Sequence, residues 1–193
     1  STPSILSFGG IDLHRPSCHE IGRLALYFHP LKNGWELLEM MPEPRNYHTA
    51  SLVGDDVFII GGCDPHKTRS DEMVSSESVF CYSAAKRSWS KRADLPEARA
   101  FHGASVMDDK VYVVGGRDNR GRYLDTILEY SPMANGWSTV LRLPRCVMGS
   151  SVVVLERRLW ILGGVSSPAE STFQPGPDDL LDDVFVVDVA HRT

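Results

Sequence analysis

Four short runs of apolar residues, rich in β-branched and aromatic side chains, each end at a pair of glycines. The runs are SILSF, VFII, VYVV and LWIL, and they precede Gly9-Gly10, Gly61-Gly62, Gly115-Gly116 and Gly163-Gly164. A run that is apolar at nearly every position predicts a strand buried on both faces. The glycines allow a sharp turn, or a close approach of another segment where a Cβ would clash. The hydrophobic pattern therefore predicts one β-unit that recurs four times.

An aromatic residue follows each of the first three glycine pairs, and a tryptophan lies seven positions after that aromatic residue. These pairs are Phe28 and Trp35, Tyr82 and Trp89, and Tyr130 and Trp137. The distance from each tryptophan to the next glycine pair is 26 residues in all three cases. The distance from a glycine pair to the following tryptophan varies, at 25, 27 and 21 residues. The constant interval predicts a packed core, and the variable interval predicts a surface loop.

Each unit reads as four short antiparallel strands. In the unit around Trp89, strands are expected at 101–107, 111–116, 126–130 and 137–141. A further strand is expected near the end of the chain, at 184–189. Asn33-Gly34 and Asn135-Gly136 favour tight hairpins just before two of the tryptophans. Four-stranded units that repeat about every 50 residues are typical of β-propeller blades. We expect an all-β fold with blade-like repeats at about 1–45, 46–98, 99–144 and 145–193.

These residues resemble the kelch repeat, in which a glycine pair, a tyrosine, a tryptophan and a Pro-Arg segment follow in order. The last part is carried by MPEPRNYH (41–48), LPEARAFH (95–102) and LPRCVMG (143–149). This alignment places Arg145 with Arg45 and Arg99, and Met148 with His48 and His102. The resemblance implies a kelch-type β-propeller of which this chain supplies about three and a half four-stranded blades of an expected six. Residues 1–193 are then one partial kelch-repeat domain.

Composition and charge narrow the choice of partners. The net charge of −5 and the pI of about 5.8 argue against nucleic acid and against anionic membranes, because no basic excess exists to neutralise phosphates. The four cysteines form no metal-binding spacing, which favours reduced thiols in the cytoplasm or nucleus. The acidic pairs at 178–179 and 182–183 are split by leucines and read as a solvated loop rather than a metal site. We expect neither a metal nor a cofactor.

The resemblance extends to the kelch-like proteins, in which BTB and BACK domains precede the propeller. It implies a domain that captures a target protein and delivers it, through domains outside this chain, to a cullin-based ubiquitin ligase. Actin binding or another scaffold role in the cytoskeleton is the alternative. Some copper oxidases also use a kelch-type propeller, but Tyr82 of the Cys81-Tyr82 pair occupies the structural position of the repeat. We therefore expect no catalysis.

The resemblance places target binding on the loops after the glycine pairs and around the Pro-Arg segments. Aromatic and arginine side chains dominate binding hot spots, and arginine grips carboxylates, so we expect an acidic or mixed-charge peptide. The candidate contact residues are Arg45, Asn46, Tyr47, Arg99, Phe101, Arg117, Asn119, Arg120 and Arg145. The three recurring arginines have an alternative structural role, and the two aromatics could instead cover the core. His48 and His102 read as packed, hydrogen-bonded scaffold residues.

Overall fold

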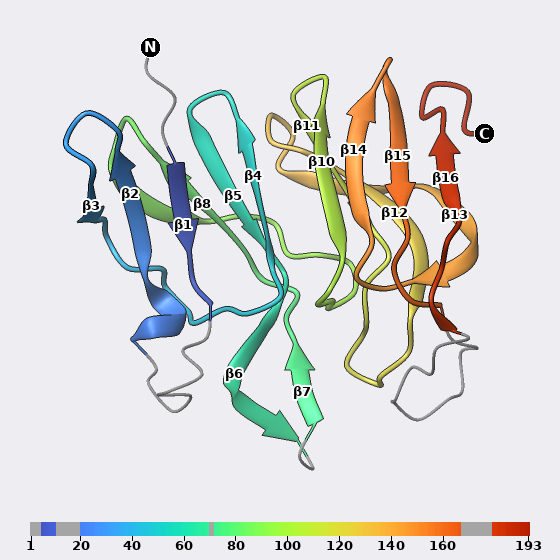
Figure 1. The fold of residues 1–193 in the computed structure, drawn as a ribbon, viewed down its shortest axis with the longest axis horizontal. Helices are drawn as coiled ribbons and strands as arrows, with labels where there is room; N and C mark the ends of the chain where they lie inside the picture. Colours follow the sequence, from blue (N-terminus) through green and yellow to red (C-terminus); the bar gives the residue numbers. More distant parts are fainter. Residues whose placement is uncertain (1–4, 11–19, 70–71, 167–178) are drawn as a thin grey trace.

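The computed structural model describes residues 5–10, 20–69, 72–166 and 179–193. Its strands form four antiparallel sheets that stand side by side, and one additional hairpin projects beyond them (Figure 1). The described ranges include the short 3-10 turn η1 (Ile21–Arg23), and no helix in them has the length and apolar character to cross a membrane. The predicted all-β propeller architecture is confirmed, and the sheets do not close into a ring.

Each sheet is one blade, numbered along the chain. Blade 1 contains β1 (Ile5–Phe8), β2 (Ala25–His29) and β3 (Gly34–Leu37). Blade 2 contains β4 (Thr49–Val53), β5 (Asp56–Ile60), β8 (Val79–Ser83) and β9 (Ser88–Lys91). Blade 3 contains β10 (Gly103–Met107), β11 (Lys110–Val114), β12 (Leu124–Ser131) and β13 (Gly136–Val147). Blade 4 contains β14 (Ser151–Leu155), β15 (Arg158–Leu162) and β16 (Val184–Val187). The projecting hairpin pairs β6 (Cys63–Arg69) with β7 (Glu72–Ser75).

The strands β5 and β11, which lead into the second and third glycine pairs, are buried on both faces, as the apolar runs predict, whereas β1 and β15 alternate between more and less exposed residues. Ile60 in β5, Val113 in β11 and Ile161 in β15 are fully enclosed. The inner strands β4, β10 and β14 lie next to one another and connect the blades along their inner edge (Figure 1). The residues that immediately precede these inner strands are therefore gathered at one end of the blades.

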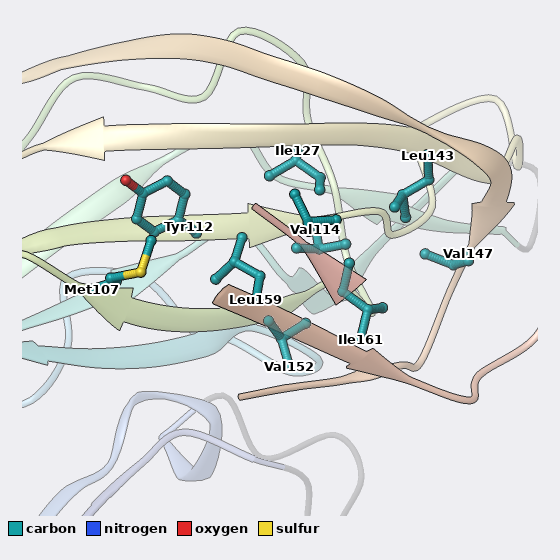
Figure 2. Close-up of a cluster of buried hydrophobic side chains, with 10 residues drawn as sticks. Met107, Tyr112, Val114, Ile127, Leu143, Val147, Val152, Leu159 and Ile161 are labelled. Carbon is teal, nitrogen blue, oxygen red and sulfur yellow. The ribbon is translucent and has the colours of Figure 1, made fainter. Parts of the chain in front are cut away.

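Apolar side chains from neighbouring blades meet between the sheets. Figure 2 shows one such cluster, where Tyr112 and Val114 of blade 3 face Leu159 and Ile161 of blade 4. A second cluster joins blades 2 and 3 and includes Phe58, and a third joins blades 1 and 2. The hydrophobic core is thus divided into layers between the blades.

Two tryptophans tie their blades to the preceding blade. The indole N–H of Trp89 donates to the carbonyl of Glu39 in blade 1 at 2.8 Å, and that of Trp137 donates to the carbonyl of Ala93 after β9 at 2.9 Å. Each indole also packs on the tyrosine of its own repeat, with ring centroids 5.1 and 4.9 Å apart. The prediction that aromatic side chains fill the space between blades is confirmed for these two repeats.

The glycine pairs permit close contact between the ends of neighbouring blades. Gly61 has φ of 57°, and a Cβ there would lie 2.5 Å from the carbonyl oxygen of Arg99. The next N–H, that of Gly62, donates to the same carbonyl at 2.8 Å. A side chain at Gly61 would therefore disrupt the hydrogen bond that joins blade 2 to the start of blade 3.

Candidate functional site

One residue from each of three consecutive blades forms a backbone ladder just before the inner strands. The N–H of Phe101 donates to the carbonyl of Tyr47 at 3.0 Å, and the N–H of Gly149 donates to the carbonyl of Phe101 at 2.8 Å. All three residues have positive φ, at 53°, 58° and 69° in chain order. We call these residues the inner ladder. Left-handed backbone is uncommon for aromatic residues, and such residues concentrate at functional sites.

The two aromatic residues of the inner ladder stack on each other at the surface. Their ring centroids are 4.1 Å apart and the ring planes differ by 25°. Tyr47 is 45% exposed, and Phe101 is half-buried. The structure therefore places these two predicted contact residues together, as a rigid apolar platform at the end of the blades.

Two other predicted contact residues, Arg45 and Arg99, are buried. They are only 2% and 1% exposed. The guanidinium of Arg99 donates to the carbonyl of Gly115 at 3.0 Å and to the hydroxyl of Thr126 at 3.2 Å, and burial lowers its pKa to about 10. These bonds tie the end of blade 2 to blade 3, so the structural alternative for this arginine is the correct one.

Arg45 has a comparable setting one blade earlier. It forms an ion pair with Glu43, hydrogen-bonds the hydroxyl of Ser78, and lies over the ring of Phe80 at 5.8 Å. Its neighbour Asn46 is also buried, and exchanges two backbone hydrogen bonds of 2.8 Å with Cys63. Neither side chain offers a surface for a partner.

Arg117 is the largest departure from the expected site. It is 5% exposed, its backbone pairs with Ala100, and a Cβ added to Gly121 would lie 3.1 Å from its guanidinium. The loop that follows therefore packs over the Arg117 side chain. The structure thus buries Arg117 rather than presenting it at the surface, and its contact with a target carboxylate stays a prediction.

The loop above Arg117 is organised by a single carboxylate. Asp118 accepts the N–H groups of Arg120 and Arg122 at 2.8 and 2.9 Å, and its second oxygen accepts from the Arg122 side chain. Although burial acts to raise the pKa of Asp118, these hydrogen bonds lower it overall. Asn119 and Arg120 are left exposed at the tip, where the Arg120 guanidinium forms no ion pair with a described residue.

Arg145 does not occupy the position of the other two recurring arginines. Its side chain is 59% exposed, and its guanidinium lies 3.3 Å from a carboxylate oxygen of Asp183. The residue that holds the structural place of Arg99 is Val147, because its carbonyl accepts the N–H of Gly116 as the Arg99 carbonyl accepts that of Gly62. By the same correspondence, Ser150, not Met148, stands where His48 and His102 stand. A count of ten residues from each tryptophan leads to Arg45, Arg99 and Val147, so the constant interval would have given this register.

The buried histidines join blades at the base of the inner ladder. The Nε2 of His102 and the hydroxyl of Thr49 in β4 are 2.9 Å apart. Burial, followed by the nearby charge of Arg99, lowers the pKa of His102 to about 3. Burial and the charge of Arg45 lower the pKa of His48 to about 4. Both residues are neutral near pH 7, in keeping with the scaffold role expected of them.

The opposite end of the blades has a different character. A cavity of about 450 Å³ between blades 3 and 4 is lined by charged residues that largely pair with one another. Its ion pairs include Arg157 with Asp108 at 2.6 Å and Lys110 with Glu129 at 2.8 Å. Over the described ranges, no group of three or more metal-ligating side chains is arranged to hold an ion. The end with the inner ladder differs, because it presents the exposed aromatic stack of Tyr47 on Phe101.

Comparison with known proteins identifies the type of repeat. A family model described as the "KLHDC2/KLHL20/DRC7 Kelch-repeats domain" matches residues 2–164. Beta-scruin of Limulus polyphemus is 36% identical over 188 residues, which cover 97% of this chain and 20% of that protein. Kelch-like protein 41 of Rattus norvegicus is 30% identical over 150 residues, which cover 77% of this chain and 25% of that protein. The chain thus spans about a fifth to a quarter of the relatives it matches.

A solved structure agrees with the fold. The structure of YjhT superposes with a TM-score of 0.70 at 17% sequence identity, and the match covers 84% of this chain and 55% of that one. At this identity the likeness concerns the fold alone.

Proposed function

Because this chain belongs to the kelch-repeat family, whose repeats are protein-interaction modules, we propose that it captures a target protein or peptide on the inner ladder and the adjoining loop. The observation that carries the proposal is the stacked, solvent-exposed pair Tyr47 and Phe101. Rigid aromatic side chains contribute large contact areas at a low cost in conformational entropy. Asn119 and Arg120 are exposed at the tip of the loop that begins at Arg117, whose backbone pairs with Ala100 next to Phe101. Arg120 there suits a carboxylate of an acidic or mixed-charge peptide.

Binding to a selected ligand tests this proposal. Short linear peptides are selected from a displayed random library with this chain as bait, and their affinities are measured by fluorescence polarisation. We expect Tyr47→Ala to weaken binding about tenfold or more, as for a hot-spot aromatic residue. Arg120→Ala should weaken binding about threefold, and more at low salt. Arg157→Ala, an exposed arginine at the opposite end, is the matched control. Unchanged affinity for both ladder-side variants would refute the assigned face.

We further propose that the captured target is delivered to a cullin-based ubiquitin ligase, in the cytoplasm or nucleus, by domains outside this chain. The similarity to kelch-like proteins supports this role, and the domain itself is proposed to be non-catalytic. The full-length polypeptide that carries this chain should then contain a BTB domain and co-precipitate a cullin. Failure to recover a cullin would count against ligase delivery while leaving target capture intact.

A cytoskeletal or scaffold role is the second candidate. It is favoured by the scruin matches, which cover more of this chain at higher identity than the kelch-like matches do. Co-sedimentation of the full-length polypeptide with actin filaments, in the absence of cullin binding, is the result expected from this candidate.

A further inference from the structure

The inner ladder carries a side-chain stack that stops one position early. Tyr47, Phe101 and Gly149 occupy successive rungs, joined by equivalent backbone hydrogen bonds and equivalent left-handed backbone angles. The first two rungs bear aromatic rings 4.1 Å apart, and the third bears no side chain. A repeat that supplies two rings and then omits the third leaves a vacant stacking position in blade 4.

Among the described residues, the space at the third rung is open. A Cβ built on Gly149 meets no heavy atom of these residues within 4 Å, and Gly149 is exposed. Gly61 and Gly62 differ sharply from Gly149, since a Cβ on either of them would lie 2.5 Å from a carbonyl oxygen. Close backbone contact therefore does not explain the missing side chain at Gly149.

The neighbouring position is also reduced in size in this blade. Ser150 stands where the two earlier repeats place His48 and His102. Ser150 is only 8% exposed, and its hydroxyl has no hydrogen-bond partner among the described residues. Blade 4 has thus lost side-chain volume at two adjacent positions, and a polar atom remains unpaired beside the vacancy.

We propose that the target inserts one aromatic side chain above Gly149, where it stacks as the third ring on the platform of Tyr47 and Phe101. This inference rests on the proposed function and specifies the chemistry of the partner. An aromatic side chain fits because its flat faces continue the offset stack, and stacked aromatic pairs gain affinity beyond the area they bury. A small or acidic side chain would gain little from the ring faces.

The test fills the vacancy from the protein itself. In Gly149→Phe the new ring occupies the third rung, on a backbone angle that Tyr47 and Phe101 already adopt. Two displayed peptide libraries, one with a fixed central tryptophan and one with alanine at that position, serve as probes. We expect selection from the tryptophan library, and about tenfold weaker binding of those peptides to Gly149→Phe. Gly149→Asn, which tolerates positive φ without adding a ring, is the matched control and should bind within about twofold of the parent chain.

A double-mutant cycle separates stacking from indirect effects. Replacing the peptide tryptophan by alanine should weaken binding to the parent chain about tenfold, and should weaken binding to Gly149→Phe by much less. If Gly149→Phe does not fold, Phe101→Leu removes the platform instead and should selectively weaken the tryptophan peptides. Equal selection from both libraries, or an additive cycle, would overturn the inference. If Tyr47→Ala still weakens binding about tenfold in that case, the proposed function survives; if it does not, both fail.

Discussion

The indoles of Trp137 and Trp35 occupy the same place in their repeats, yet one is held between two blades and the other faces solvent. Trp137 donates to Ala93 of the preceding blade and packs against the cluster between blades 2 and 3. Trp35 packs on Phe28 of its own blade and is 54% exposed. The aromatic pair is therefore formed within a blade, and the hydrogen bond is added only when another blade lies alongside.

Blade 1 also differs from the next two blades in how far its first strand is exposed. Ile5, four residues before the first glycine pair, is 55% exposed, whereas Val57 and Val111 at the same position in the next blades are buried. Register places Ile5, Phe28 and Trp35 in one row across the sheet. The same sequence pattern thus yields a buried face where another described blade packs against it, and an exposed apolar face on blade 1, where no described blade does.

The largest effect is expected from removing the partly buried indole of Trp137, which is held between two blades. Trp137→Ala should lower the free energy of unfolding by about 3 kcal/mol, because it loses the interblade packing and leaves a cavity. Trp35→Ala should lower it by about 0.5 kcal/mol, since the ring is largely solvated. Urea unfolding monitored by circular dichroism measures both. Trp137→Phe, which retains a ring but not the N–H, should fall between them. Equal losses for the two alanine variants would contradict the comparison.

Acid should act on the blade junctions that contain buried histidines. The folded state lowers the pKa of His102 to about 3 and that of His48 to about 4, below the ordinary unfolded value of about 6.5. The unfolded chain therefore binds more protons below pH 6.5, and stability present above that pH is lost as the pH falls. At pH 5 each histidine should account for a loss of about 2 kcal/mol relative to pH 7.

Unfolding free energies measured between pH 7 and pH 5 test this dependence. His102→Gln should make the profile shallower, even if its stability at pH 7 is lower. At the junction between blades 3 and 4, Ser150 stands in the position equivalent to His102. This junction supplies an internal control, because a serine side chain does not titrate between pH 7 and pH 5. A slope unchanged in His102→Gln would show that other groups govern the acid response.

A smaller effect separates the buried arginine from the exposed one. Arg99→Lys should lower stability by about 1.5 kcal/mol, because one ammonium cannot reproduce the bonds to Gly115 and Thr126. Arg145→Lys should change it by less than about 0.5 kcal/mol, since its pair with Asp183 is exposed. Thermal unfolding of both variants at one pH distinguishes them. A comparable loss of stability in Arg145→Lys would support the sequence alignment that places Arg145 with Arg45 and Arg99.

The smallest effect on stability, but a visible one on association, is expected at the exposed face of blade 1. Leu37→Lys should leave the unfolding free energy within about 0.5 kcal/mol of the parent while reducing self-association of this chain. Sedimentation velocity over a range of protein concentrations measures the self-association. Leu31→Lys, in the turn beside that face and 87% exposed, is the control. Similar association of both variants would mean that the apolar face is not the point of contact.

The fold could be predicted from the sequence because its signals are periodic and local. Glycine pairs, tryptophans and apolar runs each reflect packing that recurs from blade to blade. An ambiguous pattern in one repeat can therefore be assigned by comparison with the other repeats. The candidate site depends on features that differ between blades. Arg117 is polar and follows a glycine pair, but whether it reaches solvent depends on how the loop to Gly121 folds over it. Gly149 carries no side chain and gives no chemical signal, although counting from the tryptophans aligns it with Tyr47 and Phe101.

The indole bond between blades also has a consequence for how such proteins can change. In blades 2 and 3 the repeat brings its own donor, and the acceptor is a main-chain oxygen whose presence does not depend on residue type, as Glu39 and Ala93 illustrate. Any repeat of this kind can thus follow any other without a matched pair of substitutions. Duplication, loss or exchange of whole repeats would leave the joints chemically intact, so loops can diverge while the frame that presents them is reused.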